Sequence, residues 1–127
     1  MQLSESAVTT MLPVVDMQRA RAFYEGKLGL KPDEAQANGT TVYRLAGATV
    51  ALFPRDTATK AEHTALSFEV KDIASAIREL EQAGVKFADY DMPGLKTEGH
   101  VCVMGSEKAA WFHDTEGNCL CLHEDLH

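Results

Sequence analysis

The stretch VTTMLPVVDMQRARAFYEGKLGL, residues 8–30, holds the pattern that decides the fold. Every second position of its first part falls on one side of an extended chain, as in a strand: Val8, Thr10, Leu12 and Val14. Asp16 then stands where the N-cap of a helix belongs. A helical stripe follows, formed by Met17, Ala20, Tyr24 and Leu28, and Gly29 ends it. The stretch predicts a strand followed by a helix.

The same order returns in TALSFEVKDIASAIRELEQAG, residues 64–84. Its strand places Leu66, Phe68 and Val70 on one side, Asp72 is a second N-cap, and Gly84 ends the second helix. The capping residues Asp16 and Asp72 lie 56 residues apart, and the apolar positions of the two helices match at this offset. A repeat of this length predicts two similar units that bury their faces against each other.

Further short strands complete both halves of the chain. The first half has predicted strands at 40–45 and 48–53, joined by a tight turn at Ala46–Gly47. The second half has predicted strands at 85–88, 101–104, 109–113 and 118–124. Each half is interpreted as a strand and a helix followed by further strands. We therefore predict one α+β domain over residues 1–127, with a first module at about 8–53, a polar linker at 54–63 and a second module at about 64–124.

Composition excludes several classes of partner. The chain has 127 residues with 12 Lys and Arg against 19 Asp and Glu, a formal net charge of −7. This acidic balance argues against nucleic acid and against anionic membrane surfaces. No apolar run reaches the length of a membrane span, and no secretory signal is visible at the N-terminus. Together with the odd count of 3 cysteines, this predicts a cytoplasmic protein.

Several local strings resemble one known family. Val15-Asp16-Met17, Phe23-Tyr24-Glu25 and Leu28-Gly29-Leu30 resemble the D…FY…LGL start of the vicinal oxygen chelate superfamily, which includes glyoxalase I, bleomycin-resistance proteins and extradiol dioxygenases. Residues 68–73 are similar to the start of its second module. Residues 112–118, FHDTEGN, resemble its F-x-D-P-D-G-N hairpin, with Thr115 where the family usually has Pro. The resemblance covers residues 8–124 and implies two βαβββ modules whose curled mixed sheets surround a cavity, commonly in a homodimer.

The resemblance also implies positions for a divalent metal, and the residues there do not suit one. The implied ligand positions are occupied by Thr9, Ala51, Ala65 and Cys121. Alanine has no donor atom, a neutral threonine hydroxyl is a poor ligand, and one thiolate does not hold zinc or nickel. We therefore expect no metal cofactor, and neither glyoxalase I nor dioxygenase activity. The alternative is a displaced divalent-metal site formed by His63, Cys121 and His123.

Strand periodicity indicates which side chains face the cavity instead. If Leu66, Phe112 and Leu120 belong to the core, the residues of opposite parity form a mixed apolar and polar wall typical of small-molecule sites. These predicted ligand-binding residues are Thr9, Met11, Ala51, Phe53, Ala65, Ser67, Trp111, His113, Cys121 and His123. Core packing is the alternative for Trp111. The loop at 90–107, with its Pro and Gly, is either a cavity lid or a plain surface loop.

Two functions remain open at this point. The first is a metal-free protein that binds and sequesters a small organic molecule, as bleomycin-resistance members do with their antibiotic; the charge of −7 suits a neutral or cationic guest. The second is a glyoxalase-like lyase or isomerase that uses the displaced His/Cys metal site or a histidine general base, with His113 as the catalytic candidate. Either function is expected in a homodimer, because short modules leave sheet edges exposed.

Overall fold

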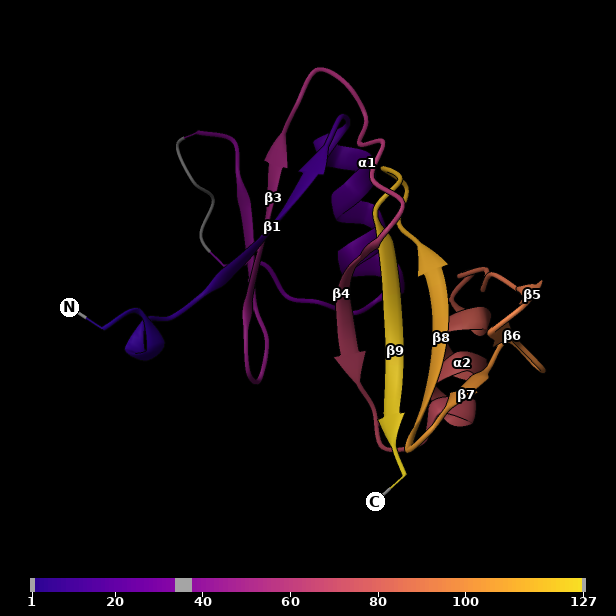
Figure 1. Cartoon of the computed structure of the whole chain (residues 1–127). Helices are drawn as coiled ribbons and strands as arrows, with labels where there is room; N and C mark the ends of the chain where they lie inside the picture. Colours follow the sequence, from indigo (N-terminus) through magenta and orange to yellow (C-terminus); the bar gives the residue numbers. More distant parts are fainter. Residues whose placement is uncertain (1, 34–37, 127) are drawn as a thin grey trace.

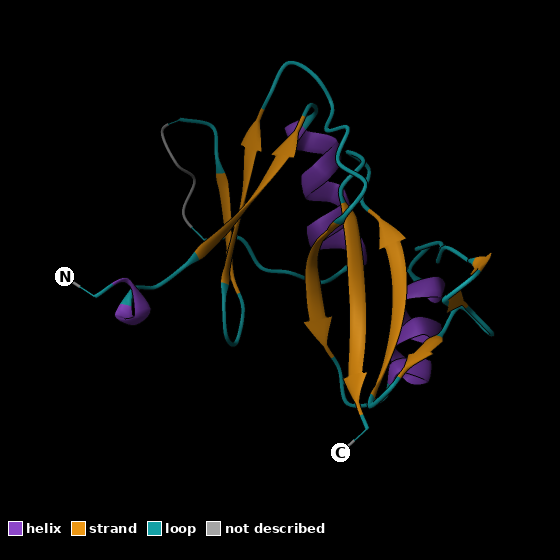
Figure 2. Cartoon of the chain, viewed as in Figure 1, coloured by secondary structure: helices purple, strands orange, loops and turns teal. Residues whose placement is uncertain are grey.

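The computed structural model describes residues 2–33 and 38–126 and contains two open sheets with two main helices (Figures 1 and 2). A short 3₁₀ helix, η1 (Leu3–Glu5), lies in the N-terminal arm. The first module then has β1 (Thr9–Val14), α1 (Met17–Arg21), its continuation η2 (Ala22–Lys27), β2 (Thr41–Arg44) and β3 (Thr49–Pro54).

The second module repeats this plan with additions. It has β4 (Thr64–Glu69), α2 (Ile73–Gln82), β7 (Cys102–Met104), β8 (Glu107–His113) and β9 (Cys119–Asp125). A small hairpin of β5 (Asp91–Met92) and β6 (Leu95–Lys96) precedes β7. This order confirms the predicted α+β class with two related modules, and no described helix is long and apolar enough to cross a membrane.

Both sheets are mixed, and the two modules use the same pairing rule. The first sheet has the order β1-β3-β2 and the second the order β4-β9-β8-β7. In each module the first strand pairs in parallel with the last, β1 with β3 and β4 with β9, and the other neighbours are antiparallel. The sheets remain separate and open, which leaves β1 and β4 as edge strands.

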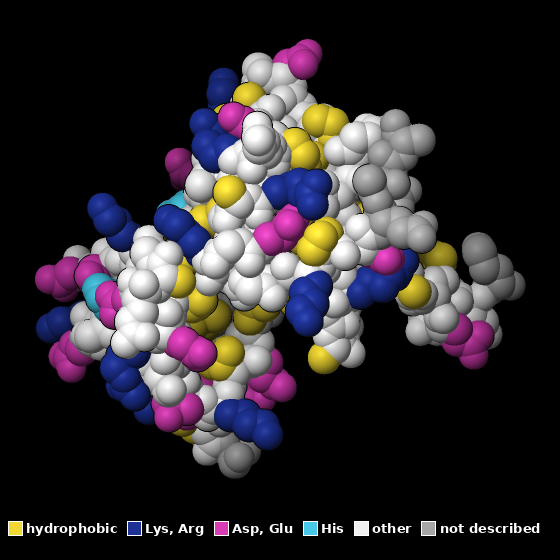
Figure 3. All heavy atoms as spheres, turned by 180° about the vertical axis from the view of Figure 1, so that it is seen from behind, with side chains coloured by type: hydrophobic (Ala, Val, Ile, Leu, Met, Phe, Trp, Pro, Cys, Tyr) yellow, Lys and Arg dark blue, Asp and Glu magenta, His cyan; other side chains and the backbone are white. Residues whose placement is uncertain are grey.

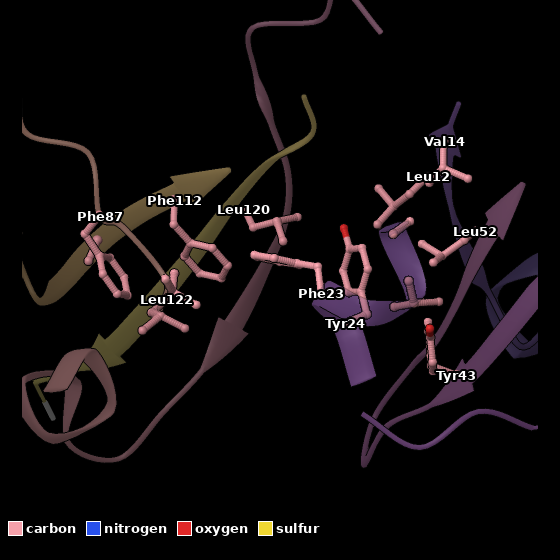
Figure 4. Packing of buried hydrophobic residues seen from close by; sticks show 14 of the residues in the cluster. Leu12, Val14, Phe23, Tyr24, Tyr43, Leu52, Phe87, Phe112, Leu120 and Leu122 are labelled. Atoms are coloured by element: carbon pink, nitrogen blue, oxygen red, sulfur yellow. The ribbon is translucent and has the colours of Figure 1, made fainter. Parts of the chain in front are cut away.

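The predicted first helix is continuous but changes its winding. α1 becomes the π-helix η2, in which the N–H of Leu28 bonds to the carbonyl of Phe23, five residues back. A π turn rotates the following side chains relative to an α-helix. The result is that two consecutive residues, Phe23 and Tyr24, are both buried. In Figure 4, Phe23 lies on the side of Phe112 and Leu120, whereas Tyr24 lies on the side of Leu12 and Leu52. One helix therefore fills the core beneath both sheets.

The core confirms the predicted side of most strands. Leu12 and Val14 in β1, Phe112 in β8 and Leu120 in β9 are buried at 1% exposure or less. Leu66, Phe68 and Val70 pack against this core but stay half-buried, because β4 is an edge strand. Both predicted N-caps form: the carboxylates of Asp16 and Asp72 accept from the backbone N–H three residues later, at 3.0 and 3.2 Å.

One predicted strand is shorter than expected. Residues 85–88 make only an isolated bridge from Phe87 to Phe112, with a further bond from the N–H of Ala88 to the carbonyl of Trp111. The reason is that Val85 is still tied to the end of α2, through a bond from its N–H to the carbonyl of Leu80. In the first module, a bridge from Pro32 to Tyr43 takes the corresponding place.

The hairpin between β8 and β9 joins the modules. The carboxylate of Glu116 accepts from the backbone N–H of Val15 and Asp16 at 2.9 and 3.0 Å, and from the guanidinium of Arg19 at 2.8 Å. The Glu116 side chain is fully buried. Asp114 in the same hairpin accepts from the hydroxyl of Tyr24 at 2.6 Å. We refer to residues 114–118 as the clamp hairpin, because it fastens the second module to the start of α1.

Candidate functional site

One face of the second sheet is turned away from its helix and carries half of the predicted site residues. The strand register places Ser67, Cys121 and Trp111 in one row across β4, β9 and β8. Because Phe112 and Leu120 point into the core, these three residues lie on the opposite face. We call this side of β4, β9 and β8 the open face; in Figure 1, α2 lies behind it.

Trp111 is the centre of the open face. It is half-buried, and its indole N–H donates to the hydroxyl of Thr64 at 3.1 Å. The ring of Tyr90 meets it edge-on, with 5.6 Å between ring centroids and an angle of 87°. Burial raises the pKa of Tyr90, so its phenol stays protonated. Trp111 thus presents an aromatic surface that the core does not cover, beside two hydroxyl groups.

Polar groups line the neighbouring end of the open face. The hydroxyl of Ser67 lies 2.6 Å from Nδ1 of His123, and Nε2 of His123 lies 3.9 Å from the Glu69 carboxylate. The register adds Glu107 and Asp125, which are paired across β8 and β9 on this same face. Three carboxylates therefore gather at one end of the sheet, and they favour a neutral or positively charged group over an anion.

The other predicted cavity residues are spread more widely. Thr9 and Met11 are exposed in β1, whereas their neighbours on β3, Ala51 and Phe53, are buried and half-buried respectively. His113 is exposed on the open face, opposite Cys119 in the register. No hydrogen bond orients its ring within the described part of the chain. Ala65 was predicted to face the cavity but packs against the core, because the bulge between Thr64 and Leu66 shifts the register of β4 there. The other nine predicted residues divide between two open sheet faces, one in each module.

Five pockets of the described chain are lined almost entirely by other residues. Of the predicted set, His113 alone lines any of these five. A pocket of about 270 Å³ on the helix side is lined mainly by apolar side chains, among them Leu30, Phe68 and Leu80. From behind, hydrophobic side chains are visible in a hollow between the two halves of the molecule (Figure 3). None of these five pockets is the cavity lined by the predicted residues that the sequence indicates.

The implied metal positions do not fit a metal in this structure. Thr9 offers an exposed neutral hydroxyl, and Ala51 and Ala65 offer no donor atom. Cys121 is 6% exposed, and burial raises the pKa of its thiol, so the coordinating thiolate is disfavoured. The thiol instead donates to the carbonyl of Leu122 at 3.2 Å. We therefore assign no chemistry to a metal at these four positions.

The alternative set of His63, Cys121 and His123 is not brought together either. His63 precedes the first residue of β4, and His123 pairs with Glu69 at the other end of that strand. Among residues 2–33 and 38–126, the group whose ligand atoms all lie within 4.8 Å of one another is Glu69, His123 and Asp125. Of the alternative set, His123 alone belongs to a group with metal-binding spacing.

Sequence reasoning did not place Tyr90 and Thr64 beside Trp111, and it did not predict the bonds from the clamp hairpin to the start of α1. Tyr90 lies in a loop, where no periodicity reveals a facing side. Thr64 has the parity of Leu66 and Phe68, but a bulge between Thr64 and Leu66 turns it to the open face. The loop at 90–107 is an ordered hairpin followed by β7, and its Tyr90 contacts Trp111.

The chain belongs to the Glyoxalase/Bleomycin resistance protein/Dioxygenase superfamily, whose model matches residues 6–122. Solved structures share the fold at low identity. A glyoxalase family protein from Bacillus anthracis is 16% identical with a TM-score of 0.75, covering 95% of both chains. UcmS2 is 20% identical with a TM-score of 0.75, covering 97% of this chain and 98% of that one.

The fosfomycin resistance protein FosX from Listeria monocytogenes is a third neighbour. A single-residue mutant of FosX, in complex with Mn(II) and 1S,2S-dihydroxypropylphosphonic acid, is 13% identical with a TM-score of 0.71. The match covers 96% of this chain and 90% of the FosX chain. No curated protein matches the chain significantly.

Proposed function

We propose that this protein binds a small organic molecule on the open face of its second sheet, without a metal ion. The observation that carries the proposal is the half-buried aromatic pair of Trp111 and Tyr90, whose centroids lie 5.6 Å apart beside the Thr64 hydroxyl. Small-molecule sites combine aromatic surface with a few fixed polar groups in this way. The donor-poor positions Thr9, Ala51 and Ala65 support binding rather than metal-assisted chemistry.

The charge of the open face indicates the class of guest. Glu69, Glu107 and Asp125 lie on this face, and the described strand positions on it hold no Lys or Arg. Aromatic rings and carboxylates together favour an organic cation. A phosphonate, such as the compound in the Listeria monocytogenes FosX structure, would be repelled by these carboxylates. The proposed guest is therefore a neutral or cationic aromatic compound, sequestered rather than converted.

A homodimer is part of the proposal. β1 and β4 are edge strands of their sheets, and Met11 on β1 is 52% exposed. A second copy would cover such edges and turn the open faces into an enclosed site. Light scattering should give about twice 13.9 kDa at micromolar concentration. A mass near that of one chain, unchanged by concentration, would contradict this part of the proposal.

Trp111→Ala tests the binding site. Benzyltrimethylammonium is a suitable probe, followed by a thermal-shift screen of amines and antibiotics. The substitution should weaken binding by about 1–3 kcal/mol, the contribution of a large aromatic contact. Trp111→Phe is the matched control and should retain most of the affinity. Because Trp111 is the single Trp of the chain, its fluorescence reports binding directly.

Stability of the same variant separates a site residue from a core residue. If Trp111 is a half-buried site residue, its replacement by Ala should lower the free energy of unfolding by less than about 3 kcal/mol. Replacement of a core aromatic residue by Ala lowers it by about 3–5 kcal/mol. Unchanged affinity for a confirmed guest, together with a large loss of stability, would assign Trp111 to the core and remove it from the site.

A metal-dependent lyase or isomerase is the second candidate. It is favoured by the group of Glu69, His123 and Asp125, whose ligand atoms lie within 4.8 Å of one another. The bond to Ser67 would orient His123 for coordination through Nε2. Elemental analysis of the purified protein distinguishes the candidates. About one zinc, nickel or manganese per chain, lost in His123→Ala, would favour the enzyme and contradict the metal-free proposal.

A further inference from the structure

His100 stands out because its backbone and its ring are both unusual. Its φ angle is 72°, the one positive value outside glycine among the described residues. It follows Gly99, with φ 57°, in a tight turn closed by bonds between the backbones of Glu98 and Val101. Such a conformation is costly for a residue with a Cβ and persists where the surroundings hold it.

Two carboxylates hold the ring of His100, one at each nitrogen. Nε2 lies 3.2 Å from the carboxylate of Glu81 in α2, and Nδ1 lies 3.0 Å from that of Asp89. The ring also packs on Phe87, with 6.0 Å between centroids. A neutral imidazole has one N–H, whereas the protonated ring has two. Only the protonated ring can therefore donate to both carboxylates at once.

The contact at Asp89 leads directly to the open face. Asp89 precedes Tyr90, which is fixed by bonds from its N–H to the hydroxyl of Thr97 and from the N–H of Thr97 to its carbonyl, both at 2.9 Å. The Thr97 hydroxyl lies 3.1 Å from Asp89. Tyr90 in turn packs against Trp111. A continuous set of contacts thus runs from α2 through His100 and Asp89 to the aromatic pair.

We propose that His100 is a pH-dependent latch that positions Tyr90 against Trp111 and so regulates the site on the open face. This inference rests on the proposed function for its biological meaning. The latch is closed when the ring is protonated and bridges Glu81 and Asp89. It loosens as the pH rises, because the neutral ring keeps at most one of the two bonds. Guest binding is then stronger in mildly acidic solution than in alkaline solution.

Other charged groups around His100 do not reverse the expected direction of the pH dependence of guest binding. The pocket beside it is lined by Glu81, Lys86 and Phe87, together with the end of α2. Lys86 is exposed and forms no ion pair within the described chain. Among the side-chain types in this cluster, histidine is the one whose charge ordinarily changes between about pH 5 and 8.

The first test uses the protein without any guest. The indole N–H signal of Trp111 is a single NMR probe, because the chain has 1 Trp. In the wild type it should shift between about pH 5.5 and 8. His100→Asn suits the left-handed backbone but cannot carry a charge, so the signal should stay near the high-pH position. His100→Arg keeps a charge at all these pH values and should hold the signal near the low-pH position.

The outcomes of this test are distinct. A pH shift of the Trp111 signal that is the same in the wild type and in His100→Asn would overturn the latch. Identical signals for the Asn and Arg variants would overturn it as well. Glu81→Gln removes one partner and should reduce the shift, with Glu5→Gln in the exposed N-terminal arm as the matched control.

The second test measures binding of benzyltrimethylammonium at about pH 6 and pH 8. The ratio of the affinity at pH 6 to that at pH 8 should be about two- to five-fold larger in the wild type than in His100→Asn, the range for partly exposed ion pairs. His100→Asn is the reference because it keeps the two histidines of the open face, His113 and His123. An equal ratio in the two proteins contradicts the latch. Failure of the proposed function alone looks different. Trp111→Ala would then leave the affinity unchanged at both pH values, while the indole signal of the protein that retains Trp111 still depended on His100.

Discussion

The two modules begin alike, yet their first helices are secured differently. Asp16 caps α1 and Asp72 caps α2 through equivalent bonds of 3.0 and 3.2 Å. Each helix start also receives a glutamate. α2 receives Glu124 from its own module, which accepts from the N–H of Ile73 at 2.8 Å. α1 receives Glu116 from the other module, through bonds to Val15, Asp16 and Arg19.

This difference between the two glutamates shows where the two modules are held together. Glu124 is half-buried, whereas the side chain of Glu116 is fully buried and makes bonds to three residues of the first module. The clamp hairpin adds a bond from the Asn118 amide to the carbonyl of Pro13 at 3.0 Å. Helix capping within a module is local, while the clamp hairpin fixes one module relative to the other.

The largest expected effect comes from removing Glu116. Glu116→Ala should destabilise the protein by about 3–5 kcal/mol, because it removes a fully buried carboxylate and leaves the backbone N–H groups of Val15 and Asp16 and the guanidinium of Arg19 without their partner. Glu124→Ala is the matched control and should cost about 1 kcal/mol, since water can reach its site. Urea unfolding of both variants measures the comparison. Equal losses would refute the idea that the clamp hairpin differs from an ordinary cap.

Acid should weaken the clamp hairpin, because its buried glutamate acts as a carboxylate. Burial opposes ionisation of Glu116, but the bonds from Arg19 and from the backbone of Asp16 outweigh it and lower its pKa from 4.5 to about 2. The ionised form therefore contributes stability that is complete above about pH 4.5 and lost as the pH falls towards 2. We expect a loss of about 2 kcal/mol, less than the full shift because Arg19 is half exposed.

Unfolding curves between pH 6 and pH 2 check this dependence. In Glu116→Gln the stability at pH 6 should already be low, and its fall between about pH 5 and 2 should be smaller than in the wild type by the same amount. An identical fall in both proteins would show that other carboxylates carry the acid sensitivity.

A smaller effect should separate two buried tyrosines. Tyr24 donates across the modules to Asp114 at 2.6 Å, and Tyr43 donates within the first module to Glu25 at 2.8 Å. Burial and the neighbouring carboxylates raise the pKa of both phenols, so both remain donors. Tyr24→Phe should lower the free energy of unfolding by about 1.5–2 kcal/mol. Tyr43→Phe should lower it by only about 0.5–1 kcal/mol, because water can reach its partner Glu25. Thermal unfolding that ranks them in the reverse order would contradict this comparison.

Charged and aromatic side chains also divide unequally between the open sheet faces of the two modules. The sheet face of the first module carries Thr9 and Met11, which offer no charge. The open face of the second module carries Trp111, His123 and Glu69. Although the two modules share one plan of strands and helices, charged and aromatic side chains gather on the open face of the second module. The first module supports that face through the clamp hairpin and the shared core.

Local patterns in the sequence were sufficient for the elements and for their buried sides. The N-caps Asp16 and Asp72 and the period of two in β8 and β9 express preferences of neighbouring residues, so they can be read without knowing the fold. The prediction at 85–88 was wrong in extent, because the end of α2 competes for Val85. The metal alternative with His63 depended on distances along β4 that a strand's parity does not give.

The sequence by itself determined the two modules, the capped helices and the core side of Phe112 and Leu120. Tertiary structure alone decided that Tyr90 meets Trp111, that Glu116 reaches α1, and that His100 lies between Glu81 and Asp89. The physical reason is the separation along the chain over which each kind of interaction acts. Capping and alternation act over a few residues, whereas Glu116 and Asp16 are 100 residues apart in the chain, and only the packing of both modules around Phe23 and Tyr24 brings such groups together.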